Sequence, residues 1–418
     1  MKNINAIYAQ SGGVTAVINA TACGVIEAVG KTDQISTIYA SLNGIIGILQ
    51  EDLIDLSLEL PANISGLKYT PAGAFGSCRY KLKSIKENFS QYQRLVDVFK
   101  AHNIGYFFYN GGGDSQDTAY KISQIGQQLD YPITCIGIPK TIDNDLAFTD
   151  NCPGFGSVAK YVAIATLEAS LDVASMAKSS TKVFILEVMG RNAGWIAASS
   201  GIIAADQSQA PHIILFPEIP FDKEKFCTKV KSCVENYGFC VIVTSEGIKN
   251  HNNQYIAQDP EITDQFGHAK LGGVAPLLAN IITTQLGFKN HWAVADYLQR
   301  SARHIASKVD VEQAYLLGKA AVELAIAGKN AVMPIIVRTN NNPYTWEIQT
   351  ANLNEVANKE KLLPRNFIND EGFGITDACK QYLAPLIQGE DYPPYKNGIP
   401  QYIKLQKNMV AKKLPVYT

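Results

Sequence analysis

The stretch at residues 139–145, Pro-Lys-Thr-Ile-Asp-Asn-Asp, holds two carboxylates, a hydroxyl and an ammonium. Asp143 offers a general base, and Lys140 offers a cation that offsets the charge of a phosphoryl group. Asn-Asp pairs alone favour a solvated turn without a ligand. The stretch directly follows an apolar run typical of a buried strand, and this position favours a catalytic loop.

Two glycine-rich turns follow other apolar runs. Residues 11–13, Ser-Gly-Gly, open a predicted helix whose free N–H groups and dipole suit a phosphate, although a tight turn without a ligand fits equally well. Residues 111–113 are three successive glycines, which permit a close backbone approach, and Asp114 adds a carboxylate to this loop. The loop is not a P-loop, and Gln116 stands where a dinucleotide fingerprint requires glycine.

Three more polar positions follow later apolar runs or end a predicted helix. Arg191 has the planar guanidinium that grips a phosphate, and Glu246 can accept hydrogen bonds from sugar hydroxyls. Tyr297 and Arg300 add a phenol and a second guanidinium. Taken singly, each is more often structural than a ligand; with the three loops above they make six polar clusters, most of them expected at one edge of a sheet.

The elements that must position these residues are apolar strands alternating with amphipathic helices. The predicted strands are residues 4–9, 35–40, 106–109, 133–138, 183–188, 213–216 and 240–243. This alternation predicts an α/β protein of the doubly wound type, in which ligands bind beyond the carboxyl ends of the strands. Residues 352–364 are expected to form a surface connection, and the last seventy residues show only weak periodicity.

Composition restricts the class of protein. The 418 residues carry a formal net charge of -1, so no global excess of charge draws the chain to nucleic acid or to a membrane. No apolar stretch reaches the length of about 18 residues that spans a bilayer, and the N-terminus lacks the apolar region of a secretory signal. The eight cysteines are scattered without zinc spacing. We therefore expect a cytoplasmic enzyme with reduced thiols and small-molecule substrates.

The six motifs together resemble the phosphofructokinase family, most closely its pyrophosphate-dependent branch. They are SGG, GGGDS, PKTIDND, EVMGR, SEG and YLQR, in that order, and the likeness extends over about residues 4–325. The resemblance implies an α/β fold of two Rossmann-like three-layer lobes with a cleft between them. Residues 1–158 and about 299–355 would form the pyrophosphate-binding lobe, and residues 159–298 and about 356–418 the sugar-phosphate lobe with a C-terminal tail.

The resemblance also implies a role for each motif residue. Asp143 is similar to the residue that acts as the general base in the family, and Lys140 and Asp114 would be the other two catalytic residues. The fructose 6-phosphate contacts would be Thr141, Asp145, Met189, Gly190, Arg191, Glu246, Tyr297 and Arg300, with Lys182 reaching in from a second subunit. The pyrophosphate contacts would be Gly12, Gly13, Arg79, Gly112 and Gly113. On local grounds alone Arg79 is more often a surface residue.

Donor choice depends on two positions in this resemblance. ATP-using relatives have glycine in place of Asp114 and of Lys140, which leaves room for the α-phosphate of the nucleotide. Here a carboxylate would repel that phosphate, and the lysine would bind the smaller donor. Where those relatives place a magnesium-binding aspartate, this chain has Gly113. The Mg²⁺ cofactor would then be held by Asp114, by Asp145 or by the phosphates themselves.

The implied activity is reversible phosphoryl transfer from pyrophosphate to the 1-hydroxyl of fructose 6-phosphate, a step of glycolysis. Two alternatives remain open: an ATP-dependent 6-phosphofructokinase, and a non-catalytic regulatory subunit that binds a sugar phosphate. The acceptor range could extend to sedoheptulose 7-phosphate, because the named contacts do not measure the length of the sugar. The family resemblance further implies a homodimer or homotetramer.

Overall fold

The computed structural model describes residues 4–206, 208–263, 269–357 and 359–417, and it divides them into two α/β lobes. The first lobe is built on β1 (Asn5–Gln10), β2 (Ile38–Ser41), β3 (Leu53–Asp55), β4 (Ile104–Gly111), β5 (Thr134–Pro139), β12 (Val332–Asn341) and β13 (Tyr344–Asn352). The second lobe is built on β6 (Val183–Val188), β7 (Ile213–Leu215), β8 (Cys240–Ser245) and β11 (Asn290–Val294). Two hairpins are separate: β9 (Gln258–Thr263) with β10 (Ala269–Leu271), and β14 (Tyr395–Lys396) with β15 (Ile399–Pro400).

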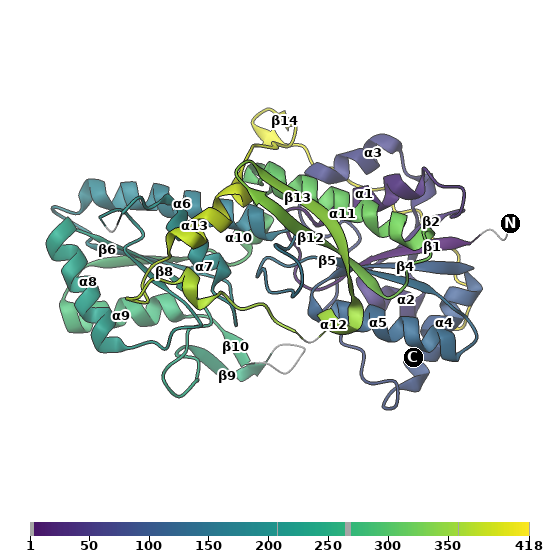
Figure 1. The fold of residues 1–418 in the computed structure, drawn as a ribbon, viewed down its shortest axis with the longest axis horizontal. Helices are drawn as coiled ribbons and strands as arrows, with labels where there is room; N and C mark the ends of the chain where they lie inside the picture. The colour runs from purple at the N-terminus through teal and green to yellow at the C-terminus, as the bar shows by residue number, and fades with distance from the viewer. Residues whose placement is uncertain (1–3, 207, 264–268, 358, 418) are drawn as a thin grey trace.

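Helices cover both faces of each sheet (Figure 1). They are α1 (Ile18–Val29), α2 (Gly44–Gln50), α3 (Pro61–Gly66), α4 (Phe89–Ala101), α5 (Gly113–Gln128), α6 (Phe155–Met176), α7 (Trp195–Ser199), α8 (Lys223–Tyr237), α9 (Val274–Leu286), α10 (Asp296–Ser301), α11 (Lys308–Ile326), α12 (Leu353–Val356) and α13 (Asp377–Leu383). The predicted fold class, two Rossmann-like three-layer α/β lobes, is confirmed.

Strand direction explains where the polar loops gather. In the described residues the first sheet has the order β13-β12-β5-β4-β1-β2-β3, and the second has the order β11-β6-β8-β7. The neighbours β5, β4, β1 and β2 are parallel, and all four strands of the second sheet are parallel. The loops that follow parallel strands emerge at a common edge of the sheet, which is where binding residues collect in such folds.

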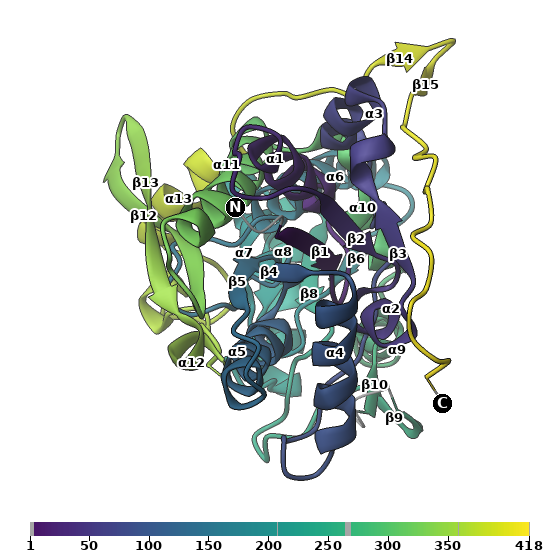
Figure 2. The same ribbon diagram turned by 90° about the vertical axis from the view of Figure 1, so that its right-hand side faces the viewer.

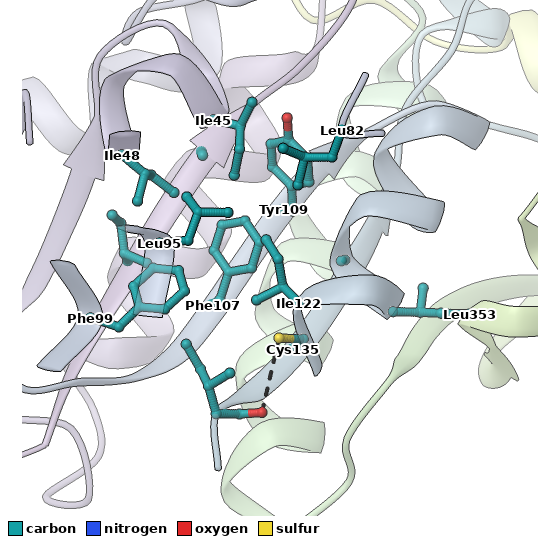
Figure 3. Packing of buried hydrophobic residues seen from close by; sticks show 14 of the residues in the cluster. Ile45, Ile48, Leu82, Leu95, Phe99, Phe107, Tyr109, Ile122, Cys135 and Leu353 are labelled. Atoms are coloured by element: carbon teal, nitrogen blue, oxygen red, sulfur yellow. Dashed lines mark hydrogen bonds between the residues drawn. The ribbon is translucent and has the colours of Figure 1, made fainter. Parts of the chain in front are cut away.

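Alternate residues of β1 face opposite cores, as the pleat of a strand requires. Ile7 and Ala9 pack with residues of α2, α4 and α5, while Ala6 and Tyr8 pack with residues of α1 and α11. Figure 3 shows the first of these cores, in which Phe107 and Tyr109 lie among side chains of the covering helices. Burial of apolar surface on both faces fixes the sheet rigidly enough to position its loops.

Helix α11 returns the chain to the first lobe and also holds the start of α6. The N-cap of α6 is Gly154, which has no side chain to satisfy the free N–H groups of the first turn. The buried carboxylate of Asp310 on α11 accepts hydrogen bonds from the Gly154 N–H and the Ser157 N–H, each at 2.9 Å, and from the Ser157 hydroxyl at 2.6 Å. A side chain from another helix therefore supplies the cap.

The C-terminal tail departs from the sequence-based expectation, which assigned residues 356–418 to the second lobe. Its final segment runs along β3 of the first lobe (Figure 2). The Val410 N–H donates to the Leu53 carbonyl at 2.9 Å, and the Asp55 N–H donates to the Asn408 carbonyl at 2.9 Å. The physical reason is that β3 ends the sheet and leaves backbone groups unpaired, which an extended segment can satisfy.

Residues 352–364 also differ from expectation, because they are more than a surface connection. Leu353 and Val356 are buried in the core of the first lobe.

Within the described ranges, no helix combines the length and the apolar composition needed to cross a membrane. All eight cysteines lie in these ranges and are free thiols.

The Asp310 cap predicts a stability effect. Replacing Asp310 by alanine removes the acceptor for three buried donors, so we expect the free energy of unfolding to fall by about 2 kcal/mol or more. The shift of the urea unfolding midpoint measures this. Glu312→Ala on the exposed face of the same helix is the matched control and should shift the midpoint little. Equal midpoints for the two variants would contradict the capping role.

Candidate functional site

Three turns meet at the carboxyl edge of the first sheet. The Ser11 N–H donates to the Asn110 carbonyl at 2.9 Å, and the Lys140 N–H donates to the Gly111 carbonyl at 3.2 Å. These bonds join the turns after β1, β4 and β5, which the pairing of the strands already places side by side. The sequence-predicted glycine-rich turns and the 139–145 loop thus form one surface.

Three cations converge on the turn after β1. The Lys140 ammonium donates to the Gly13 carbonyl at 2.5 Å. A Cβ atom built on Gly13 would lie 2.7 Å from Nη1 of Arg300 and 3.9 Å from Nη2 of Arg79, so both guanidinium groups approach the same residue. The missing side chain is what allows this approach. Three cations gathered at one turn form a site for a polyanion.

The Lys140 ammonium is buried, and its charge is stabilised only in part. Burial, followed by the nearby Arg300 charge, lowers the pKa of Lys140 to about 8, while Asp143 and Asp145 act in the opposite direction. An anion bound at this point would offset the repulsion between the two cations. The geometry therefore favours binding of a multiply charged anion over a neutral ligand.

Two carboxylates, those of Asp143 and Asp145, lie near Lys140. Burial, and then the Asp145 and Glu246 charges, raise the pKa of Asp143 to about 7, against the opposing effects of Lys140 and Arg79. A carboxylate with a pKa near neutrality can take a proton and release it again at the working pH. Asp143 therefore has the properties of a general base.

Thr141 ties the two aspartates to the loop. The Asp143 N–H donates to the Thr141 hydroxyl oxygen at 3.1 Å, and the Thr141 hydroxyl hydrogen-bonds to the Asp145 carboxyl. Burial raises the pKa of Asp145, and the bond from Thr141 partly counteracts this effect. The loop thus presents both carboxyl groups in a fixed arrangement.

The second lobe contributes the loops after β6 and β8. The Met189 N–H donates to the Gln299 side-chain carbonyl at 3.3 Å, which links the β6 loop to α10. Gly190 has a φ of +131°, a conformation that only glycine adopts readily. Burial raises the pKa of Glu246, while the Gly190 N–H and the Arg191 charge act in the opposite direction. Both predicted residues, Arg191 and Glu246, therefore lie in one neighbourhood.

A cavity of about 630 Å³ opens beside these loops. Its lining residues include Glu187, Met189, Glu246, Gly273, Asp296 and Tyr297. The Arg300 guanidinium lies over the Tyr297 ring, 3.9 Å from the ring centre, and the same side chain approaches Gly13. Arg300 therefore connects the polyanion site of the first lobe with the cavity of the second.

Asp114 lies at the margin of the polyanion site. Its carboxylate pairs with the Lys81 ammonium at 2.8 Å, and both side chains are about half exposed. Gly112 lies near Lys140, since a Cβ built on it would be 3.8 Å from the Lys140 carbonyl oxygen, whereas a Cβ on Gly113 would meet no protein atom within 4 Å. The sequence did not indicate the pairing with Lys81.

Lys182 lies apart from the other predicted residues of its own chain. It directly precedes β6, whereas Met189 directly follows β6, so the two lie at opposite ends of the strand. The Lys182 ammonium hydrogen-bonds to the Ala177 carbonyl. Lys182 therefore does not join the other predicted sugar-phosphate residues within its own chain.

Glu187 is a cavity residue that the sequence reasoning missed. Its buried carboxylate accepts the Ala275 N–H at 2.8 Å and the Gly273 N–H at 3.2 Å, at the start of α9. The signal that could have found it is a single carboxylate inside the otherwise apolar run 183–188. An acidic residue buried in a strand indicates a specific partner or ligand.

The donor set suits a magnesium ion better than a transition metal. In the residues that the structure describes, no three His, Cys, Asp or Glu side chains gather to hold a metal ion. Asp143 and Asp145 offer two carboxylates beside the polyanion site. Mg²⁺ commonly takes one or two carboxylates and completes its shell with phosphate oxygens and water. The Asp114 carboxylate is already paired with Lys81.

Comparison with known proteins shows likeness over the whole chain. The family model described as phosphofructokinase matches residues 5–325. A protein of Halomonas elongata is 59% identical over 418 residues, covering 100% of both chains, and one of Methylococcus capsulatus is 59% identical over 411 residues, covering 98% of both. Both are named pyrophosphate–fructose 6-phosphate 1-phosphotransferase.

Solved structures agree with this likeness. The crystal structure of a pyrophosphate-dependent phosphofructokinase from Marinobacter aquaeolei is 59% identical in sequence and superposes with a TM-score of 0.92 over 99% of both chains. A phosphofructokinase from Pichia pastoris, at 18% identity and a TM-score of 0.67, shares the fold.

The approach of Arg300 to Gly13 predicts the effect of adding one methyl group. Gly13→Ala should displace the guanidinium and weaken pyrophosphate binding about tenfold or more, the effect of losing one charge-assisted hydrogen bond. Titration calorimetry measures the affinity. Gly30→Ala, at a position where a Cβ has ordinary contacts of 3.7 Å, is the control and should bind like the wild type. Unchanged affinity in Gly13→Ala would exclude this turn from the anion site.

Proposed function

Because the chain belongs to the phosphofructokinase family, we propose that it transfers a phosphoryl group between pyrophosphate and the 1-hydroxyl of D-fructose 6-phosphate. The forward reaction gives fructose 1,6-bisphosphate and phosphate. The observation that carries the proposal is the meeting of Lys140, Arg300 and Arg79 beside the Asp143 and Asp145 carboxylates. The reaction exchanges one phosphoanhydride for one phosphoester, so it runs in both directions and serves glycolysis and its reversal.

In this proposal the donor binds to the lobe formed by residues 1–158 and about 299–355. The pyrophosphate contacts are Gly12, Gly13, Arg79, Gly112, Gly113 and Lys140. The glycines allow the donor to approach the backbone closely, and the cations balance the charge of the donor. The convergence of Lys140, Arg300 and Arg79 at Gly13 supports this assignment.

The acceptor binds against the second lobe, in the region of residues 159–298. Its contacts are Thr141, Asp145, Met189, Gly190, Arg191, Glu246, Tyr297 and Arg300, with Lys182 contributed to the site of a second copy. The cavity beside Met189, Glu246 and Tyr297 has carboxylate and phenol groups that suit the hydroxyls of a sugar, and Arg300, which lies over the Tyr297 ring, is the cation for its phosphate.

The chemical step needs a base, a positioned hydroxyl and a stabilised leaving group. Asp143 accepts the proton of the 1-hydroxyl, and the resulting oxygen attacks one phosphorus atom of pyrophosphate. The bond from that phosphorus to the bridging oxygen breaks, and the electron pair leaves with phosphate. Lys140 lies at the polyanion site and stabilises the charge that develops on the phosphates.

Asp114 and Lys140 account for the choice of donor. A carboxylate at the margin of the polyanion site repels the additional phosphate of a nucleotide, and its pair with Lys81 occupies space there. Lys140 adds a charge contact that pyrophosphate needs, because this donor has no nucleoside to contribute binding energy.

Mg²⁺ is the proposed cofactor, and the Asp145 carboxylate together with the phosphates of the substrate would hold it. When bound, it supplies charge neutralisation on the phosphates. Asp143 and Lys140 keep their roles in proton transfer and phosphate binding.

We also propose a cytoplasmic homodimer or homotetramer. The free thiols fit a reducing compartment. Strand β11 ends the second sheet and exposes Trp292 and Val294, a surface that a second copy could cover. Lys182 directly precedes β6, the strand that pairs with β11.

The direct test of this function compares donors. Purified protein with Mg²⁺ and fructose 6-phosphate should form fructose 1,6-bisphosphate with pyrophosphate and far more slowly with ATP at equal concentration. In the double variant Asp114→Gly, Lys140→Gly the rate with pyrophosphate should collapse, by at least about a hundredfold. Rapid turnover with ATP and none with pyrophosphate would overturn the proposal, and no turnover with either would favour a binding subunit.

The base has its own test. Asp143→Asn keeps the shape of the side chain but cannot take a proton, so kcat should fall by about two orders of magnitude or more. The KM for fructose 6-phosphate should change little, since the base acts in the transition state. Asp370→Asn, an exposed position, is the control for loss of one charge. A kcat close to that of the wild type in Asp143→Asn would remove this residue from the mechanism.

A further inference from the structure

A short segment outside the matched family region crosses between the two halves of the site. Residues 359–361 follow α12, well beyond residue 325, where the family match ends. Glu360 forms an antiparallel bridge with Leu146, and the Lys361 N–H donates to the Asp145 carbonyl at 2.7 Å. The backbone of this segment therefore pairs directly with the loop that carries the candidate catalytic aspartates.

The Lys361 ammonium is directed into the same loop. It donates to the Asp150 carbonyl at 2.8 Å, to the Thr149 carbonyl at 2.9 Å and more weakly to the Asn144 side-chain carbonyl at 3.4 Å. An ammonium has three donors, and here each has an acceptor in residues 144–150. The ammonium also lies 5.4 Å from the centre of the Trp195 ring, whose N–H donates to the Lys361 carbonyl at 2.9 Å.

The loop needs such support because of the residue between its two aspartates. Asn144 is fully buried and has a φ of +55°, in the left-handed region. Its side chain accepts the Cys152 N–H at 3.0 Å and donates to the Tyr382 hydroxyl at 2.9 Å. The conformation at Asn144 sets the relative directions of the residues before and after it, which are Asp143 and Asp145. A buried cation bonded to both ends of this loop holds that conformation.

Glu360 holds the loop of the other lobe. Its carboxylate accepts hydrogen bonds from the Asn192 side-chain amide at 2.9 and 3.2 Å. Asn192 directly follows Arg191, and its side-chain oxygen accepts the Tyr255 hydroxyl at 3.1 Å. Of these two consecutive residues, Lys361 therefore bonds to the aspartate loop, and Glu360 bonds to the Arg191 loop.

We infer that Glu360 and Lys361 are positioning residues that align the Asp143 loop of the first lobe with the Arg191 loop of the second lobe. This inference rests on the proposed function, which assigns the general base to the Asp143 loop and a contact with the sugar phosphate to the Arg191 loop. Neither side chain needs to touch a substrate: Lys361 acts through Asn144 and the loop carbonyls, and Glu360 acts through Asn192. An error of about 1 Å in such an alignment can lower a rate about a hundredfold.

The test compares Lys361→Met with Lys329→Met. The two variants lose the same charge, but Lys329 is exposed and lies outside the loop that Lys361 contacts. Lys361→Met should lower kcat about ten- to a hundredfold and leave the KM for pyrophosphate within about threefold, whereas Lys329→Met should match the wild type. A kcat for Lys361→Met equal to that of the control would overturn the inference, even if the variant melts at a lower temperature.

A second variant keeps the inference testable if Lys361→Met does not fold. Glu360→Ala removes an exposed side chain and should raise the KM for fructose 6-phosphate about tenfold, while Glu360→Gln, which keeps one acceptor oxygen, should restore it. Equal KM values for Glu360→Ala and the wild type would contradict the role of Glu360.

Hydrogen exchange separates this inference from the proposed function. In Lys361→Met, or in Glu360→Ala if the former does not fold, amide exchange should accelerate in residues 141–152 or 189–194, and it should not do so in Lys329→Met. This readout needs no turnover. If the wild type proves inactive, the proposed function fails while exchange still decides the inference, and unchanged exchange in both segments would overturn it.

Discussion

The candidate site depends on the buried ammonium of Lys140, which lies beside the glycines of the turn after β1 and bonds to one of their carbonyls. The Lys140 ammonium bonds the Gly13 carbonyl, and Arg300 approaches the same residue because glycine leaves the space free. Burying a cation near other cations costs free energy, and the lowered pKa of Lys140 reflects this cost. The Asp143 and Asp145 carboxylates offset part of it. In the proposed function a bound pyrophosphate would offset the rest, and this would couple binding of the donor to the chemistry of the aspartate loop.

Such an arrangement needs rigid support, and the fold supplies it from both lobes. The two-sided cores of the first sheet fix the strands whose ends carry the glycine turns. Asp310 on α11 caps the start of α6, just after the aspartate loop. Lys361 holds that loop, and Glu360 holds the loop after β6 through Asn192. Residues far apart in sequence therefore stabilise a loop whose left-handed Asn144 and buried charges would be unfavourable alone.

Many of the strands and the loops of the candidate site could be predicted from the sequence, because local patterns specify strands and turns. The run 183–188 is a strand with the predicted bounds, and the loops after β1, β4 and β5 meet as parallel strand order requires. The pairing of Asp114 with Lys81 and the bracing by Lys361 depend on contacts between distant segments, which carry no local periodicity. The prediction that the C-terminal tail belongs to the second lobe is wrong for the same reason. The tail pairs with β3 of the first lobe, and an extended segment that completes a sheet edge has no sequence pattern of its own.

The most direct test of the account is the affinity of the protein for pyrophosphate when the buried ammonium is removed. Titration calorimetry should compare the wild type with Lys140→Met and with Lys329→Met, a variant at an exposed lysine. We predict that Lys140→Met binds pyrophosphate about ten- to a hundredfold more weakly, the effect of losing a charge-assisted contact, while Lys329→Met binds like the wild type. Equal affinity in all three proteins would contradict the account, because the anion would then bind elsewhere.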